Sequence, residues 1–241
     1  MEISELDKWY SIKEYDPERK EIKAIIRLGR IKEKKILLLD TYGVMHIAPL
    51  LRKKANSVTA IHNHKRIINY CKRKSEGISF ITSSTNRLPF HSGSFDAVIS
   101  LWSGLHYLKS KSVIISELKR VLKDKGIVLI EEADEKSEFV AILNILVPRK
   151  MSLIRKKREK LKVALQKHFD VSETKLRNIY YFKNDQQLKG YFKKEMIFSE
   201  KRTFTKKMDQ RLSQYLSKKK TLNVNEYSVF YVCQKKDIST F

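Results

Sequence analysis

The sequence has only two cysteines and no long apolar run. Cys71 and Cys233 stand far apart and have no paired spacing, which argues against a zinc site or a disulfide framework. No stretch of 18 apolar residues exists, and the N-terminal residues have neither the basic end nor the apolar run of a signal peptide. We therefore expect a soluble, cytoplasmic protein without a transmembrane segment, in which both thiols serve packing.

Acidic residues are also scarce. The chain has 27 Asp and Glu against 51 Lys and Arg, a formal net charge of +24. Residues 1–140 hold 26 basic and 18 acidic residues, whereas residues 141–241 hold 25 and 9, so the excess is concentrated late. This balance favours a polyanion such as RNA, or an anionic membrane surface, as a partner. The alternative is that these basic residues face solvent and bind no such partner.

The stretch that organises the chain is Ile36–Asp40, a short run of branched apolar residues that ends on a carboxylate. Its length and composition predict a strand buried on both faces of a parallel sheet. After a turn at Thr41–Val44 the pattern becomes helical up to Lys54, although Pro49 limits it to a first turn or a kink. Ligands of such sheets sit over the carboxyl ends of the strands, so we expect a pocket at Asp40–Val44.

Strands and helices alternate along the rest of the chain. Residues 1–31 predict a leading helix. Further strands are predicted at residues 58–61, 78–82, 95–101, 127–130, 173–182 and 227–232, with helices at 65–73, 113–122, 137–169 (interrupted at Pro148), 185–194 and 206–216. This order predicts an α/β fold with a doubly wound, mostly parallel sheet of seven strands, the last two reversed at its edge.

Three motifs carry a family resemblance. Leu88-Pro89-Phe90 is followed by Gly93-Ser94-Phe95-Asp96 and an apolar strand, and a helix ends in Leu118-Lys119-Arg120-Val121-Leu122 before Gly126. Over residues 17–135 the chain resembles the class I S-adenosylmethionine-dependent methyltransferase family, most of all its small type 11 branch. The resemblance implies a Rossmann-like methyltransferase fold, S-adenosyl-L-methionine as cofactor and methyl transfer as activity.

The resemblance also implies cofactor contacts at the strand ends. They fall on Asp40, Tyr42 and Gly43 after the first strand, His62 after the second, Ser84 and Thr85 after the third, and Ser100 at the end of the fourth. Three of these places depart from the family pattern. Tyr42 stands where a small residue is expected, His62 replaces an acid that would accept from the ribose hydroxyls, and Ser84 replaces an Asp that would accept from the adenine amino group.

The sequence does not identify a catalytic group, because methyl transfer mainly requires alignment of the reacting atoms. His106 is the one candidate for deprotonating an acceptor, although a histidine there commonly packs or caps a helix. The acidic run Glu131–Glu135 is interpreted as a solvated loop and helix cap. His62 and His64 have no third ligand nearby, so no metal site is expected.

We expect four parts: an N-terminal helical segment (1–31), a Rossmann-like methyltransferase core (32–136), a basic helical lid or insertion with an edge strand (137–222), and a last strand with a tail (223–241). The cations of residues 149–162, 201–207 and 218–220 could bind RNA or another polyanion through this C-terminal half, while the nearby aromatics are interpreted mainly as core. The preferred function is methyl transfer to an unidentified acceptor, for which RNA or another anionic substrate is a candidate. The alternative is a catalytically inactive relative that binds nucleic acid or a protein partner.

Overall fold

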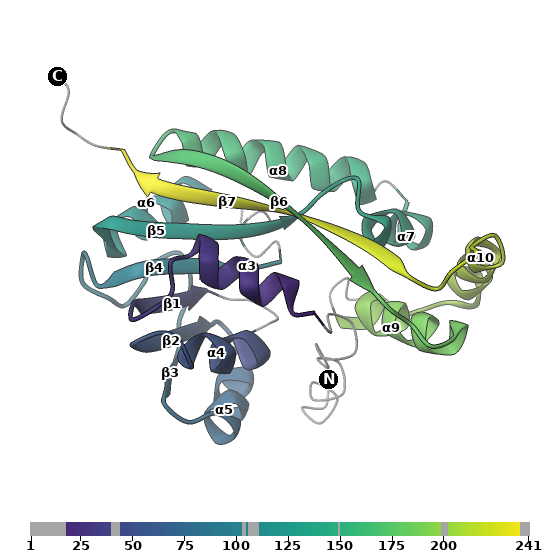
Figure 1. Cartoon of the computed structure of the whole chain (residues 1–241), viewed down its shortest axis with the longest axis horizontal. Coiled ribbons are helices and arrows are strands. Elements are labelled where there is room, and N and C mark those ends of the chain that lie inside the picture. The colour runs from purple at the N-terminus through teal and green to yellow at the C-terminus, as the bar shows by residue number, and fades with distance from the viewer. Residues whose placement is uncertain are drawn as a thin grey trace. The chain divides into compact units, whose positions relative to one another are not determined.

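A computed structural model describes residues 18–39, 44–102, 105, 111–148, 150–198 and 202–236 (Figure 1). In this part of the chain seven strands form one sheet in the order β3-β2-β1-β4-β5-β7-β6. The strands are β1 (Lys35–Leu39), β2 (Ser57–His62), β3 (Ile78–Thr82), β4 (Phe95–Ser100), β5 (Leu122–Ala133), β6 (Phe169–Tyr180) and β7 (Val224–Lys235). Strands β1 to β5 pair in parallel, and β7 runs against them (Figure 1). The predicted α/β fold with a mostly parallel seven-stranded sheet is confirmed.

Helices connect the strands. They are α3 (Lys20–Leu28), α4 (Val44–Arg52), α5 (Lys65–Lys74), α6 (Lys111–Val121), α7 (Glu138–Leu146), α8 (Lys150–Gln166), α9 (Asp185–Phe198) and α10 (Lys206–Leu216). The connections through α4 and α5 step from β1 towards β3, whereas α6 connects β4 to β5 in the other direction. Because such crossovers are right-handed, α4 and α5 cover one face of the sheet and α6 the other.

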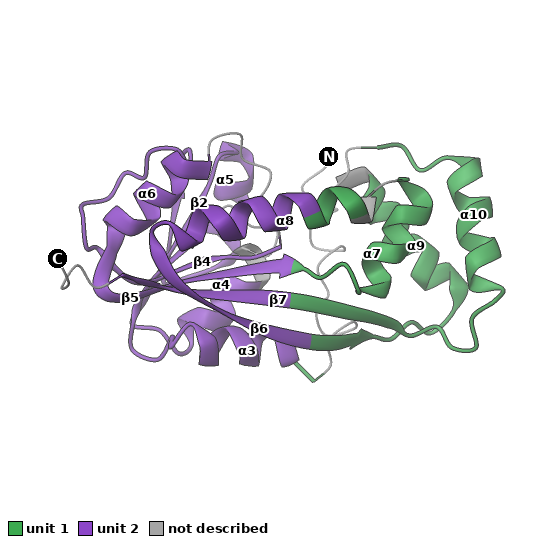
Figure 2. Ribbon diagram, turned by 90° about the horizontal axis from the view of Figure 1, so that it is seen from above, with its two compact units in different colours: residues 1–19, 133–155, 177–228 green, residues 20–132, 156–176, 229–241 purple. Residues whose placement is uncertain are grey.

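The chain forms two compact units (Figure 2). The first comprises residues 1–19, 133–155 and 177–228, and the second residues 20–132, 156–176 and 229–241. We call them unit 1 and unit 2. The four-part division expected from the sequence stays a prediction. In the described residues no helix is both long and apolar enough to cross a membrane.

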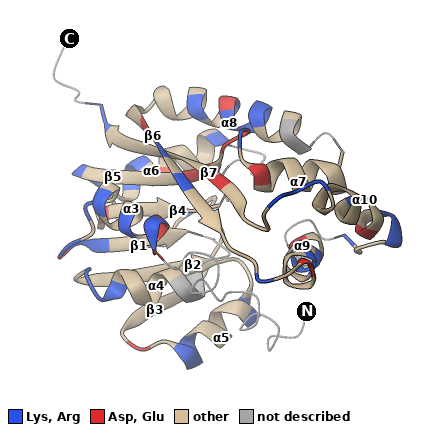
Figure 3. Ribbon diagram, turned by 45° about the vertical axis from the view of Figure 1, so that its right-hand side comes forward, with Lys and Arg blue, Asp and Glu red and all other residues tan. Residues whose placement is uncertain are grey.

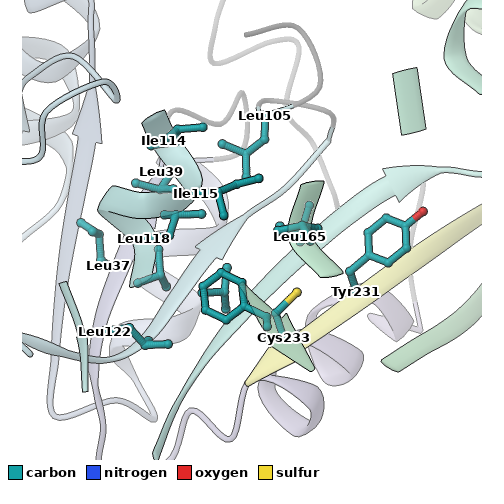
Figure 4. Close-up of a cluster of buried hydrophobic side chains, with 14 of the residues drawn as sticks. Leu37, Leu39, Leu105, Ile114, Ile115, Leu118, Leu122, Leu165, Tyr231 and Cys233 are labelled. Carbon is teal, nitrogen blue, oxygen red and sulfur yellow. The ribbon is translucent and has the colours of Figure 1, made fainter. Parts of the chain in front are cut away.

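Unit 2 contains the central strand and its core. Leu37 and Leu39 belong to a buried cluster with Ile114 and Leu118 of α6 (Figure 4). Ile36 and Leu38, which alternate with them, are equally buried on the opposite face. The same cluster includes Leu161 and Leu165 of α8 and Val229, Tyr231 and Cys233 of β7. The strand is therefore buried on both faces, as its apolar run predicts.

Unit 1 holds α7, α9 and α10 around an aromatic cluster. Phe139 of α7 contacts Tyr180, Tyr191 and Phe192, and Phe182 packs on Tyr191 at a centroid distance of 5.7 Å. Tyr180, Phe182 and Phe192 are buried, so they form core rather than a stacking surface. Tyr181, in contrast, is 42% exposed. The interpretation of these aromatics as mainly core is confirmed.

Glu138, in the first turn of α7, joins three parts of unit 1. Its carboxylate accepts hydrogen bonds from the Tyr215 hydroxyl (2.7 Å) and the Asn225 backbone N–H (3.0 Å), and it pairs with Lys219. Partial burial alone would raise the pKa of Glu138, but the bonds from Lys219, Asn225 and Tyr215 outweigh it, and the pKa lies below its ordinary value. The carboxylate thus fixes α7, α10 and β7 to one another.

Pro49 lies inside α4, which continues to Arg52. Of the two outcomes expected at Pro49, a helix limited to its first turn is therefore wrong, whereas a kink stays a prediction. A proline removes one backbone donor, and the buried side chains of Ile47, Ala48 and Leu51 keep this short helix on the sheet. Residues 122–125, expected to close a helix, are instead the first part of β5, where Leu122 pairs with Phe95.

Candidate functional site

The carboxyl ends of β1, β2 and β4 lie together because these strands are parallel neighbours. Leu39 is in register with Ile61 on one side and with Ser100 on the other. Asp40, Tyr42, Gly43 and His106 lie outside the described residues, so their predicted roles stay predictions. The predicted residues that the structure does place are His62, Ser84, Thr85 and Ser100, which lie at or just after the ends of β2, β3 and β4.

His62 ends β2 with a buried side chain, 8% exposed. Its Nδ1 accepts a hydrogen bond from the His64 backbone N–H at 3.0 Å, and its carbonyl oxygen accepts one from the Ser83 N–H at 3.2 Å. Because Nδ1 is an acceptor, a neutral His62 carries its proton on Nε2. The contact with Ser83 also ties the end of β2 to the chain that leaves β3.

Ser84 and Thr85 follow β3 in a tight turn. The Ser84 hydroxyl oxygen accepts from the Asn86 N–H at 3.2 Å, and the Ser84 carbonyl oxygen accepts from the Ser83 hydroxyl at 3.1 Å. Thr85 is buried, whereas Ser84 is exposed. The Ser84 hydroxyl keeps a proton to donate and a second lone pair, so it can meet either a donor or an acceptor of a ligand.

The Leu88-Pro89-Phe90 segment that follows is held by α6. Arg120 donates to the carbonyl oxygens of Phe90 (2.6 Å) and Leu88 (2.9 Å), and Glu117 accepts from the Leu88 N–H at 2.7 Å. Arg120 and Glu117 also form an ion pair. The hydrogen bond from Arg120 holds the pKa of Glu117 below its ordinary value, against the opposing effect of burial. Arg120 of the Leu118–Gly126 motif therefore anchors the Leu88-Pro89-Phe90 motif in the loop after β3.

Ser100 ends β4, and its side chain is 1% exposed. The register of β4 places it on the face of Val98 and Leu39, next to the core of unit 2. Among the described residues its Oγ has no hydrogen-bond partner. A buried hydroxyl without a partner costs about 1–3 kcal/mol, so this position at the strand edge is suited to a group supplied by a ligand.

Trp102, two residues later, is bonded to α3. Its indole Nε1–H donates to Oε1 of Glu21 at 2.8 Å, and Glu21 is buried. Trp102 has a φ of +54°, a left-handed conformation that a bulky residue seldom adopts. Reasoning from sequence missed this pair, because an acid in the first turn of a helix is ordinary and 81 residues separate the partners.

Asp96 of the Gly-Ser-Phe-Asp motif lies at the opposite edge of the sheet. It accepts from the Lys35 backbone N–H and from the Lys123 ammonium group, both at 2.9 Å. Burial by itself raises the pKa of Asp96, but these hydrogen bonds outweigh it and the pKa lies below its ordinary value. Asp96 therefore fixes the beginnings of β1 and β5 and takes no part in the candidate site.

Known proteins match this core. Residues 41–130 match the family model described as a methyltransferase domain. YqeM from Bacillus subtilis (strain 168), a curated protein named as a candidate methyltransferase, is 31% identical over 107 residues, which are 42% of this chain and 43% of YqeM. Over residues 41–130 the core therefore resembles a class I methyltransferase domain. The matched segment spans less than half of the length of YqeM, so the likeness concerns this domain and not the whole of either protein.

Solved structures extend the likeness in fold beyond the methyltransferase domain. BH2331 from Bacillus halodurans C-125, named as a candidate methyltransferase, has a TM-score of 0.59 at 14% identity, with 90% of this chain and 99% of that chain covered. YcgJ from Bacillus subtilis has a TM-score of 0.61 at 12% identity with the same coverage. Because both are far below 25% identity, they show a shared fold over most of the chain, and no more.

Three acids of the run Glu131–Glu135, at the end of β5 and just after it, are buried instead of solvated, which corrects the expectation. Glu131 and Glu132 are the two residues before the last residue of β5 and are 1% and 0% exposed, and Asp134, just after the strand, is 2% exposed. In unit 1, the Asp134 N–H donates to the Tyr227 carbonyl oxygen at 2.7 Å, and its carboxylate accepts from the Lys136 N–H. Within the described ranges no group of three His, Cys, Asp or Glu side chains is placed to hold a metal ion.

The cations beyond the methyltransferase domain divide into two groups. Lys219 pairs with Glu138 and also donates to the Asn223 carbonyl oxygen, Lys162 pairs with Glu173, and Lys189 donates to the Ser213 hydroxyl at 2.6 Å. These cations stabilise the fold locally. The second group, Lys206, Lys207, Lys218 and Lys220, is exposed.

Unit 1 also has an open hollow of about 460 Å³, which contains none of the predicted site residues. It is lined by Asp185, Gln186, Lys189, Gly190, Lys193, Phe204 and Asp209.

Proposed function

We propose that this chain transfers the methyl group of S-adenosyl-L-methionine to an acceptor bound at the carboxyl edge of β1, β2 and β4. The observation that carries the proposal is the buried Ser100 hydroxyl, which has no partner among the described residues and lies at the edge where ligands of this fold bind. The match of residues 41–130 to a methyltransferase domain supports it.

Among the described residues, His62, Ser84, Thr85 and Ser100 offer polar groups to the cofactor at this edge. We assign Asp40, Tyr42 and Gly43 to its amino-acid end, His62 to the ribose, Ser84 and Thr85 to the adenine, and Ser100 to the region between β1 and β4. When bound, the cofactor supplies a sulfonium methyl group for in-line displacement. The contribution of the protein is to hold and orient both reactants, which is the largest demand of this reaction.

His62 changes the direction of the hydrogen bond that this site can make to the ribose. A carboxylate at the end of β2 would accept hydrogen bonds from both ribose hydroxyls, whereas a neutral His62 with its proton on Nε2 donates one. We expect one hydrogen bond to a ribose oxygen in place of two charged ones. Cofactor binding should therefore be weaker than in a site with an acid at this position.

For the acceptor we propose an RNA. The support is the net charge of +24, which raises the local concentration of polyanions and speeds their encounter with the protein. His106 stays the candidate for deprotonating the acceptor, and the cytoplasm stays the predicted location.

The second candidate is a relative without cofactor that binds nucleic acid or a protein partner. The ends of β2 and β3 favour it, because neither His62 nor Ser84 supplies the carboxylate that the resemblance implies. Titration calorimetry with S-adenosylhomocysteine separates the two candidates. Micromolar binding that is lost in Asp40→Ala supports methyl transfer, whereas undetectable or millimolar binding by folded protein supports the second candidate.

Ser100→Ala sharpens this experiment, with Ser228→Ala as a matched control at a buried serine of β7. If the hydroxyl contacts the cofactor, Ser100→Ala weakens binding about five- to tenfold, the equivalent of one hydrogen bond, and Ser228→Ala does not. Equal affinities for wild type and Ser100→Ala would remove Ser100 from the site.

A further inference from the structure

One face of α5 is strongly basic and is exposed. Lys65, Arg66, Lys72 and Arg73 are all exposed, with the exposed Asn69 between them. Spacings of three, four and seven residues place these side chains on the same side of a helix. The two pairs of cations are separated by seven residues, which is about 10 Å along the helix axis.

No carboxylate accompanies these cations. Between Asp40 and Glu76 the sequence has eight Lys or Arg and no Asp or Glu. None of the four side chains has an ion pair or hydrogen bond among the described residues. This face differs from α8, where Lys162 pairs with Glu173, and from the turn after α10, where Lys219 pairs with Glu138. Figure 3 shows the same contrast, with basic segments and no acidic segment on α5.

Folding does not account for this arrangement. Cations are favourable at the C-terminal end of a helix, where Lys72 and Arg73 lie, but unfavourable in its first turn, where Lys65 and Arg66 lie. The buried side of the helix is supplied by Ile68, Tyr70 and Cys71 and needs no charge on the opposite face. The basic first turn therefore opposes the helix dipole without a compensating contact within the unit.

We propose that the exposed face of α5 is a docking surface for the phosphate backbone of RNA. The helix begins three residues after His62, so its first turn lies at the carboxyl edge of the sheet and RNA along α5 reaches the candidate site. A membrane surface fits less well, because helices that lie on membranes combine cations with exposed apolar side chains. The large exposed apolar residues of the described chain are Val113, Leu153, Val163 and Tyr181, and none is on α5.

The choice of RNA rests on the acceptor proposed above, but the surface is tested without cofactor. The quadruple variant Lys65→Gln, Arg66→Gln, Lys72→Gln, Arg73→Gln is compared with Lys206→Gln, Lys207→Gln, Lys218→Gln, Lys220→Gln, which removes the same charge from exposed positions in and just after α10. Glutamine keeps a helix propensity close to that of lysine and arginine, so both variants should fold. Binding of a fluorescent single-stranded RNA of about 20 nucleotides, a length that covers the few-nucleotide footprint of such sites, is measured by anisotropy over a range of salt concentrations.

We expect the α5 variant to bind at least about tenfold more weakly near physiological salt and to lower the slope of log K against log salt by about 3, close to 0.7 for each lost phosphate contact. The α10 variant should keep the wild-type slope. Equal losses in both variants would show a net-charge effect and overturn the proposal, as would a loss confined to the α10 variant.

DNA of the same sequence and vesicles of anionic phospholipid test the identity of the partner. Tighter α5-dependent binding to either of them than to RNA overturns the assignment of the partner. The assay contains no cofactor and measures RNA binding alone. A protein that transfers no methyl group can therefore still show α5-dependent binding of RNA.

Discussion

Gly126 packs so closely on Asp96 that a Cβ at position 126 would lie 2.9 Å from the Asp96 carbonyl oxygen. The same Cβ would lie 2.7 Å from the side chain of Leu122. This is where β5 pairs with β4, next to the irregularity between Phe95 and Ala97. Gly126, at the end of the Leu118–Gly126 motif, therefore allows β4 and β5 to approach each other closely.

Gly126→Ala should lower the free energy of unfolding by about 1–3 kcal/mol, the usual cost of overpacking. Gly190→Ala is the control, because a Cβ there meets nothing within 4 Å and alanine favours the helix α9 by about 0.5–1 kcal/mol. Urea denaturation measures both. A Gly126→Ala protein as stable as wild type would show that the strands separate easily.

Trp102→Phe keeps an aromatic ring but removes the donor to Glu21. The carboxylate of Glu21 stays buried, so we expect a loss of about 1.5–3 kcal/mol of unfolding free energy. Glu21→Gln keeps an acceptor oxygen and should cost less than half as much. If the two variants are equally stable, the indole hydrogen bond does not hold the turn after β4.

Arg120→Lys tests the anchor of the Leu88–Phe90 segment. A lysine supplies one point charge and cannot reach two carbonyl oxygens and a carboxylate at once. We expect faster hydrogen exchange at the Leu88 and Phe90 amides, and weaker binding of S-adenosylhomocysteine through the adjoining Ser84 turn. Lys119→Arg, one position earlier, should change neither. Unchanged exchange in Arg120→Lys would contradict the anchor.

Stability should depend on pH through Glu138. Its pKa in the folded protein lies below its ordinary value, so the ionised form stabilises the fold above the unfolded pKa of about 4.3. That contribution is lost as the pH falls through the lower, folded pKa. Glu138→Gln should be less stable than wild type near pH 7, and the difference should shrink on acidification below about pH 4. A difference that is constant with pH would assign the role to packing alone.

His62→Asp restores the acid that the resemblance implies at the end of β2. Two charged hydrogen bonds to the ribose hydroxyls should tighten binding of S-adenosylhomocysteine by about tenfold or more. His64→Asp changes the same charge at an exposed neighbour and controls for net charge. Unchanged calorimetric affinity in His62→Asp would place the ribose elsewhere.

Much of the fold follows from local patterns. The bounds of β3 and α10 agree with the predicted residues 78–82 and 206–216. Both have strong local signals: a short apolar run bounded by turns for β3, and a helical pattern behind the capping Thr205 for α10. The alternation of strands and helices, and with it the doubly wound sheet, follows from such local signals and the handedness of the crossovers.

What could not be predicted depends on contacts between distant residues. Glu131 and Glu132 read as solvated because a run of acids usually is, but β5 continues through them into the interior. Lys219 looked like part of a phosphate-binding run and is instead a partner of Glu138, 81 positions away. Only tertiary structure brings such pairs together. The roles of Asp40, Tyr42, Gly43 and His106 stay predictions.

The two cysteines have a practical consequence. Both are buried, and burial raises the pKa of Cys71 to about 11 and that of Cys233 to about 12. Because the thiolate is the reactive form, both thiols should react slowly at neutral pH. A single cysteine introduced on a solvent-facing position would therefore accept a maleimide dye or a spin label selectively, without prior removal of the native thiols.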